Sequence, residues 1–152
     1  MPEKETLRRA QADRRAGKSP STQAGEFVRE EIHHVREGEH GARSAEQAVA
    51  IGLSKARRSG VDLPAPPASA SESTRRSARS ARRRAGSRKR PSAKRSRASM
   101  RRLKREPRGT ASRKSLSRQA KTAARRRSKQ SRSAAARKAA RTRKRTRRAA
   151  AQ

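Results

Sequence analysis

The clearest helical segment of the chain opens with a capping box and runs Ser44-Ala45-Glu46-Gln47-Ala48-Val49-Ala50-Ile51-Gly52-Leu53-Ser54-Lys55-Ala56-Arg57-Arg58. In a capping box, the first hydroxyl and the side chain three residues later each satisfy a backbone N–H that the helix leaves unpaired. Small and apolar residues recur at offsets of 0, 3, 4, 7, 8 and 11 from Ala45, which is the period of one helical face. Gly60 followed by Val61 is typical of a left-handed helix ending. The pattern predicts a helix over about residues 44–58.

A second helical face precedes this segment. Its apolar members follow the same three- and four-residue spacing and are Ala24, Phe27, Val28, Ile32 and Val35. Ser19 or Thr22 can cap the helix, Pro20 is favourable at its first position, and Gly38 supplies a stop. The sequence therefore predicts a helix at about 22–37, a loop, and the helix described above, which together form a helix-loop-helix module at 19–63.

The module presents one apolar face, formed by Phe27, Val28, Ile32, Val35, Val49 and Leu53. So few large side chains bury too little surface to offset the entropy that is lost when the whole module is ordered. We therefore expect this face to pair with a second copy, giving a homodimer, or to dock on a protein partner.

The module also resembles a family of small bacterial proteins known as a domain of unknown function. The resemblance lies in Ser21-Thr22-Gln23-Ala24-Gly25-Glu26-Phe27-Val28-Arg29-Glu30-Glu31-Ile32-His33-His34, in Gly38, in Gly41-Ala42-Arg43-Ser44 and in Gln47-Ala48-Val49-Ala50-Ile51-Gly52-Leu53-Ser54. It implies a bacterial origin and a Lys/Arg/Ala-rich tail after the module, and it transfers no catalytic residue. The tail is also similar in composition to bacterial histone-H1-like proteins.

Composition limits how much of the chain can fold around one core. The 152 residues include 46 Lys and Arg against 12 Asp and Glu, a net charge of +34, and only 28% are hydrophobic. Phe27 is the single aromatic residue and cysteine is absent. This composition argues against an enzyme, against thiol or disulfide chemistry and against a cofactor. The longest apolar run, at 48–53, is far too short for a membrane span.

The charge is concentrated in one half of the chain. Residues 73–152 hold 34 Lys and Arg and one acidic residue, Glu106. A proline-rich linker at 64–74 precedes this half, and a weakly amphipathic leader at 1–18, expected to be a frayed helix, precedes the module. Like charges without an apolar period predict a disordered tail at 75–152, in which helix near 133–141 forms only on a polyanion. The predicted fold class is thus a mostly disordered chain with a small all-α module.

Clusters of basic residues in the tail are the strongest functional signal. They are Arg82, Arg83, Arg84, Arg88, Lys89, Arg90, Arg101, Arg102, Lys104, Arg105, Arg125, Arg126, Arg127, Arg143, Lys144, Arg145, Arg147 and Arg148. Guanidinium groups grip phosphate oxygens in pairs, and each neutralised phosphate releases counterions. The interleaved residues are Ala and Ser rather than aromatics that stack on single-stranded bases. The clusters predict binding to the nucleic acid backbone, with duplex DNA favoured over RNA.

Three functions are compatible with this pattern. The first is a histone-like, nucleoid-associated protein that binds DNA without sequence specificity in the cytoplasm. The second is an RNA-binding or ribosome-associated basic protein, and the third is an adaptor whose module recruits a DNA-processing enzyme. Reading of bases by a helix-turn-helix is disfavoured because the loop is long and the first half is nearly neutral.

The three histidines, His33, His34 and His40, raise the question of a metal site. Adjacent histidines on a helix point in different directions, and no His-Glu-x-x-His pair occurs. The sequence therefore predicts surface or partly packed histidines and no metal site.

Overall fold

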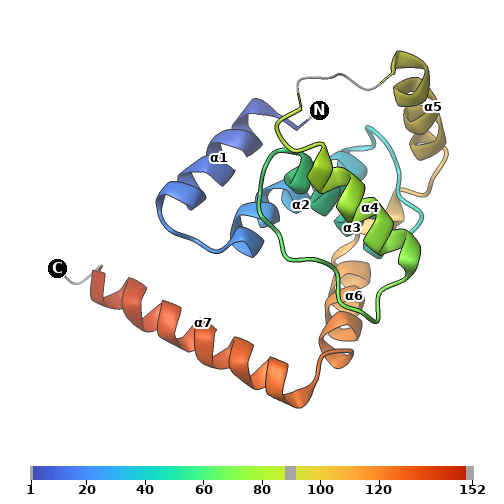
Figure 1. Cartoon of the computed structure of the whole chain (residues 1–152). Helices are drawn as coiled ribbons and strands as arrows, with labels where there is room; N and C mark the ends of the chain where they lie inside the picture. Colours follow the sequence, from blue (N-terminus) through green and yellow to red (C-terminus); the bar gives the residue numbers. More distant parts are fainter. Residues whose placement is uncertain (1, 88–91, 150–152) are drawn as a thin grey trace. The chain divides into compact units, whose positions relative to one another are not determined.

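The computed structural model describes residues 2–87 and 92–149, and helices account for the regular structure of these residues (Figure 1). The chain is 73% helical, and no strand occurs among the described residues, so the expectation of a mostly disordered chain is wrong. The chain divides into two units, residues 1–115 and 116–152, which are treated separately below. In chain order the elements are α1 (Lys4–Arg15), α2 (Pro20–Glu37), α3 (Ala45–Arg58), α4 (Glu72–Arg83), α5 (Ala93–Lys104), the 3-10 turn η1 (Gly109–Ala111), α6 (Arg113–Arg125) and α7 (Lys129–Ala149).

The two helices expected from the periodicity are α2 and α3, and their ends form as the capping residues predict, except that Gln47 accepts the N–H of Arg43, which precedes the cap Ser44. The Ser44 hydroxyl accepts the Gln47 N–H at 3.2 Å, and Gln47 Oε1 accepts the Arg43 N–H at 2.7 Å. Gly60 has a φ of 88°, and the Val61 N–H donates to the Ala56 carbonyl at 3.1 Å, which is the predicted left-handed ending of α3. α2 starts two residues earlier than expected, with Ser19 as its cap.

Gly52 is the point of closest approach between α2 and α3. A Cβ atom at this position would lie 2.7 Å from the Cα of Val28 and 3.0 Å from the Phe27 carbonyl oxygen. Only a residue without a side chain fits between the two backbones, so the small residues in the α3 stripe do allow the close helix packing that the sequence predicts.

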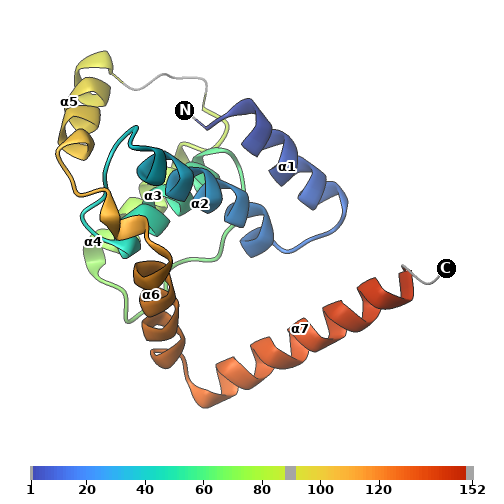
Figure 2. The same cartoon turned by 180° about the vertical axis from the view of Figure 1, so that it is seen from behind.

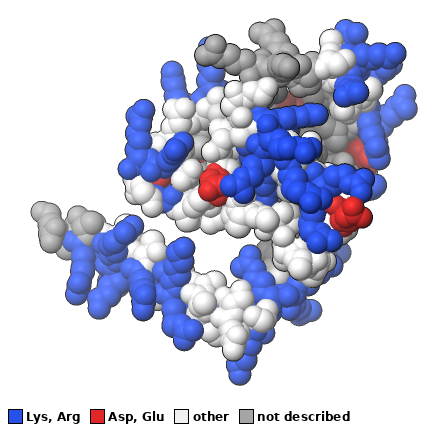
Figure 3. Space-filling model, in the orientation of Figure 1, with Lys and Arg blue, Asp and Glu red and all other residues white. Residues whose placement is uncertain are grey.

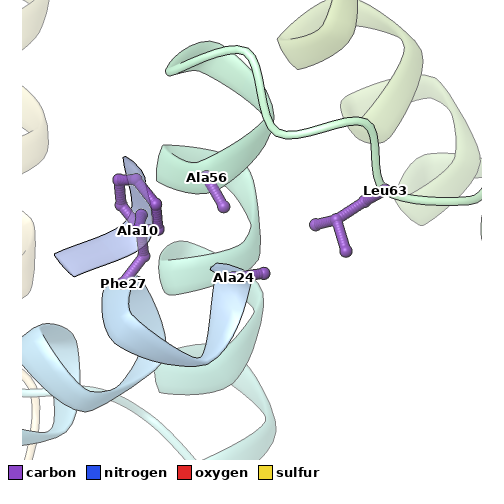
Figure 4. Packing of buried hydrophobic residues seen from close by; sticks show 5 residues of the cluster. All are labelled: Ala10, Ala24, Phe27, Ala56 and Leu63. Carbon is purple, nitrogen blue, oxygen red and sulfur yellow. The ribbon is translucent and has the colours of Figure 1, made fainter. Parts of the chain in front are cut away.

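The first core cluster lies where α1, α2 and α3 meet, and α1 runs beside α2 in both views (Figures 1 and 2). Its buried members are Ala10, Ala24, Phe27, Ala56 and Leu63 (Figure 4). Leu7, Leu53 and Val61 pack against them. The segment expected to be a frayed leader is therefore a packed helix, and Leu63, the last residue before the proline-rich linker, is part of the core.

The second core cluster ties a distant segment to the α2–α3 loop. Val35, Ala42, Ala48 and Ala111 are each 0% exposed, and Ile32 packs against them. Backbone hydrogen bonds join the same regions, because the Gly41 N–H donates to the Leu103 carbonyl and the Ala42 N–H to the Pro107 carbonyl. Residues 103–111, which we name the clamp segment, thus complete a core begun by α2 and α3.

The apolar face proposed for a partner is covered by the chain itself. Phe27 and Val35 are buried, whereas Val28, Ile32, Val49 and Leu53 are half-buried. α1 contacts α2, α4 contacts α3, and η1 contacts both α2 and α3. The burial that a lone helix pair lacks is supplied within residues 1–115, and pairing of this face with a second copy stays untested.

The tail is helical because its composition favours helix and its serines cap it. Arg, Lys and Ala rank among the best helix formers. The hydroxyls of Ser71, Ser112 and Ser128 each accept a backbone N–H three residues later, at 3.1 to 3.2 Å. α4 also buries Ala78 and Ala81. The predicted disorder at 75–152, with helix only after binding, is corrected accordingly: local propensity and capping outweigh the like-charge repulsion.

Candidate nucleic-acid interface

The cationic residues predicted to bind phosphate lie on helices and on the turns that end them. All of those that the structure describes are exposed: Arg82, Arg83 and Arg84 at the end of α4, Arg101, Arg102, Lys104 and Arg105 at the end of α5, Arg125, Arg126 and Arg127 at the end of α6, and Arg143, Lys144, Arg145, Arg147 and Arg148 in α7. Arg88, Lys89 and Arg90 lie outside the described residues. Clustering at helix C-termini is electrostatically favourable, because cations offset the helix dipole there.

α7 carries the densest array of positive charge. Ten of its 21 residues are Lys or Arg, none is acidic, and every side chain described in it is exposed. Figure 3 shows Lys and Arg along the helix and no Asp or Glu on it. The uncharged positions are mostly Ala, Ser and Thr, and the hydroxyls of Thr142 and Thr146 donate back to helix carbonyls. The surface of α7 therefore offers little except positive charge.

A pocket of about 350 Å³ lies between α3 and α4. It is lined by Ser54 and Arg58 of α3 and by Arg76, Ser77, Ser80, Ala81 and Arg84 from α4 and its end. Three guanidinium groups and three hydroxyls are donors suited to a phosphate. Of these residues, only Arg84 belongs to the basic clusters predicted from the sequence, because the contact between α3 and α4 has no signal in the sequence.

A second hollow, of about 520 Å³, lies along α5. Arg101, Arg102 and Arg105, all selected from the sequence, line it together with Ala98 and Glu106. The spacing of three and four residues places these three cations on one helical face. Glu106 is the single acidic residue after position 72, and its negative charge would repel an anion in this hollow.

Most cations of the candidate interface have no acidic partner. Arg82 pairs with Asp62 at 2.8 Å, and Arg76 pairs with Glu72 at 2.8 Å, both fully at the surface. Beyond residue 91, no ion pair occurs in the part of the chain that the structure describes. These positive charges are left for counterions or for an external polyanion.

Unlike the exposed cations, Lys55 belongs to a buried cluster in which it is paired with acidic residues. Lys55 Nζ lies 2.9 Å from Glu30 Oε1 and 2.8 Å from Glu31 Oε2. Burial alone would lower the pKa of Lys55, but its contacts with Glu31 and Glu30 outweigh burial and raise the pKa above its ordinary value. Burial would likewise raise the pKa of Glu30, but hydrogen bonds from Lys55 and from the Glu3 N–H hold the pKa below its ordinary value. The cluster links α1, α2 and α3.

The histidines occupy two environments. His33 is exposed and lies 3.0 Å from Glu37 on the surface of α2. His34 and His40 are only 7% and 5% exposed, and their rings meet edge to face at 6.0 Å between centroids. The sequence could not place them together, because the turn at Gly38 brings the loop residue His40 back toward α2.

No known family, no curated protein and no solved structure matched this chain on comparison. Within the described residues, no helix has the length and apolar character required to cross a membrane.

Proposed function

We propose that the protein binds duplex DNA without sequence specificity and neutralises its phosphates, in the manner of a histone-like, nucleoid-associated protein. The observation that carries this proposal is α7, with ten exposed cations and no acidic residue over 21 positions. In the first unit, the pocket beside α4 and the hollow along α5 each gather three further guanidinium groups.

The charge spacing on α7 suits a nucleic acid strand. An α-helix rises 1.5 Å per residue, so α7 is about 31 Å long and carries one positive charge per ~3 Å. Phosphates follow one another at roughly 3.4 Å along each strand of B-DNA. The two linear charge densities are therefore close. Cations on the side of α7 that faces the duplex can meet phosphates, and the others lie within the counterion atmosphere.

Helix dimensions favour duplex DNA over duplex RNA. The major groove of B-DNA, about 12 Å wide, admits an α-helix, whereas the major groove of A-form RNA is deep and too narrow for one. The proposed mechanism differs from that of a flexible tail, because α7 presents cations in a fixed array and loses less entropy on binding.

The decisive experiment measures affinity of the full chain by fluorescence anisotropy against two unrelated DNA duplexes and one structured RNA. The two DNA affinities should agree within a few-fold and should exceed the RNA affinity at the same salt. With six to ten phosphates contacted, affinity should fall about 10³ to 10⁵-fold between 50 and 200 mM salt. Tighter binding to RNA would favour the RNA-binding alternative, and affinity that ignores salt would refute phosphate neutralisation.

Two charge variants of equal size test the role of α7. The first replaces Arg143, Lys144, Arg145, Arg147 and Arg148 with Gln, which keeps helix propensity. The control replaces five exposed, unpaired cations of the first unit, Lys4, Arg8, Arg14, Arg15 and Arg43, with Gln. Each lost phosphate contact reduces the slope of log affinity against log salt by about 0.9. The α7 variant should lose most of five such contacts and the control almost none, and equal losses would show that only net charge counts.

A further inference from the structure

Three buried ligand-type side chains converge beside the α2–α3 loop. Glu31, His34 and His40 each offer one oxygen or nitrogen atom, and these atoms all lie within 4.8 Å of one another. Glu31 and His34 stand three residues apart on one face of α2, and His40 comes from the loop that begins at Gly38. The exposed fractions of the three residues are 0%, 7% and 5%.

The carboxylate of Glu31 is the unusual member of this group. Neither oxygen receives a hydrogen bond, although both are fully buried. Lys55 Nζ forms an ion pair with Oε2 at 2.8 Å, and this one cation also pairs with Glu30. Two buried carboxylates therefore share a single positive charge, which leaves a buried negative charge that needs a cation.

His40 directs a lone pair at this carboxylate. Its Nδ1 lies 3.0 Å from the Gly41 carbonyl oxygen, and because a carbonyl only accepts, Nδ1 carries the proton. In the neutral ring Nε2 is then an acceptor, and it faces Glu31 Oε1 at 3.4 Å. When the ring is neutral, two acceptors therefore oppose each other with no proton between them. A histidine that donates its other N–H to a backbone carbonyl has the arrangement of a metal ligand.

His34 completes the group and is itself oriented by a carboxylate. Its Nε2 lies 2.9 Å from Glu3 Oε1 and 3.7 Å from Glu39 Oε2. Carboxylates beside a ring nitrogen fix the orientation of a ligating histidine and raise its basicity. Both of these carboxylates are about half exposed, so one side of the group opens to water.

We propose that Glu31, His34 and His40 bind a divalent transition-metal ion of the Zn²⁺ class. Ligand atoms about 2.0–2.1 Å from a tetrahedral zinc lie roughly 3.3–3.4 Å from one another, the separation already present between Glu31 and His40. The ligand atom of His34 lies within 4.8 Å of the other two. Two histidines and one carboxylate leave a fourth position for water or an acidic side chain, and Lys55 holds the second oxygen of Glu31.

The test uses the full, untagged chain, stripped of nucleic acid at high salt and of metal by a chelator. Zn²⁺ binding is measured by calorimetry and by the metal retained after gel filtration, and Co²⁺ is used as a spectroscopic probe of coordination. The wild type should bind one Zn²⁺, melt at a higher temperature with Zn²⁺, and give the intense visible absorption of tetrahedral Co²⁺. Weak Co²⁺ absorption together with an unchanged melting temperature would overturn the proposal without any variant.

Substitutions locate the ion. His40→Gln and His34→Gln should each weaken Zn²⁺ binding by at least the 10 to 100-fold that loss of a mere supporting partner costs. His33→Gln is the matched control, because His33 is the same residue type, one position away, and pairs only with Glu37 at the surface. Equal loss in His33→Gln would reject the site. If the wild type stays metal-free while its stability depends on protonation of His40, a charged His40 neutralises Glu31 instead, and the metal proposal fails.

Discussion

The N–H of Gly41 donates to the carbonyl of Leu103 at 2.8 Å, so the loop between α2 and α3 is held by backbone from the far end of α5. A Cβ atom at Gly41 would overlap the carbonyl of Glu106. The clamp segment (residues 103–111) therefore needs a residue without a side chain at this position. This contact makes the clamp segment, which lies in the basic half of the chain, a structural part of the first unit.

Gly41→Ala should destabilise the first unit. Forced displacement of packed backbone costs about 1–3 kcal/mol or more, so we expect a loss of this size in the free energy of unfolding. Gly25→Ala is the control, because nothing lies within 4 Å of a Cβ there and Gly25 is inside α2. That variant should gain about 0.5–1 kcal/mol from helix propensity. Chemical denaturation measures both, and a stabilising Gly41→Ala would contradict the clamp.

Acid should weaken the first unit through Glu30. The pKa of Glu30 in the folded state lies below its ordinary value of 4.5, so the folded state binds the proton less readily than the unfolded state. The stability that Glu30 contributes is complete above about pH 4.5 and is lost as the pH falls toward the folded pKa. Unfolding followed from neutral to acid pH should show a decline that Glu30→Gln reduces. Glu5→Gln, which alters an exposed pair at 3.5 Å, should leave the decline unchanged.

Loosening α7 without changing its charge should weaken DNA binding. Ala139→Gly with Ala140→Gly costs about 1 kcal/mol of helix stability at each site. If the fixed array of cations contributes, affinity for duplex DNA should drop several-fold while the salt slope stays the same. The matched control is Ala139→Ser with Ala140→Ser, which costs less helix propensity and should lose correspondingly less affinity. Unchanged affinity in the glycine variant would show that order in α7 is irrelevant to binding.

Asp62→Asn should barely affect stability and should slightly favour DNA binding. Asp62 and Arg82 form a pair at 2.8 Å, but their side chains are 76% and 65% exposed. Exposed pairs are worth about 0–1 kcal/mol, so the free energy of unfolding should change by less than that. Arg82 is then free for phosphate, and affinity at low salt should rise. A fall in affinity would place Asp62 in a different role.

The helices α2 and α3 could be predicted from the sequence because the signals that set them are local. Ser44, Gln47 and Gly60 set the ends of α3 by hydrogen bonds within a few residues. The apolar period of α2 and α3 also predicted which residues pack, as Phe27 and Val35 show. The sequence does not predict that α1, α4 and η1 cover this face, because their buried residues are mainly alanines that form no apolar stripe.

The prediction of a disordered tail is wrong because helix capping by serines outweighs repulsion between the like charges. Each of Ser71, Ser112 and Ser128 is followed three residues later by Thr or Ser, in a run of strong helix formers. In the structure they begin α4, α6 and α7, which shows that capping serines were the readable signal.

The cluster of Glu31, His34 and His40 could be read only in part. The spacing of Glu31 and His34 places both on one face of α2, but His40 stands beyond a turn whose path depends on Gly38 and on the clamp segment. The cationic residues were easier to select, because exposure follows from their chemistry. The gathering of Arg84 with Arg58 and Arg76 in the α3–α4 pocket depends on a contact between two helices for which the sequence has no signal.

The large sequence separation between the clamp segment and its contacts affects the order in which the chain folds during its synthesis. Thr110 donates to the Ala42 carbonyl at 2.8 Å across 68 positions of sequence. When the nascent chain has left the ribosome only as far as the linker at 64–74, Val35 and Ala48 are not yet covered by Ala111. The amino-terminal half can therefore complete its core only after the ribosome has synthesised the clamp segment.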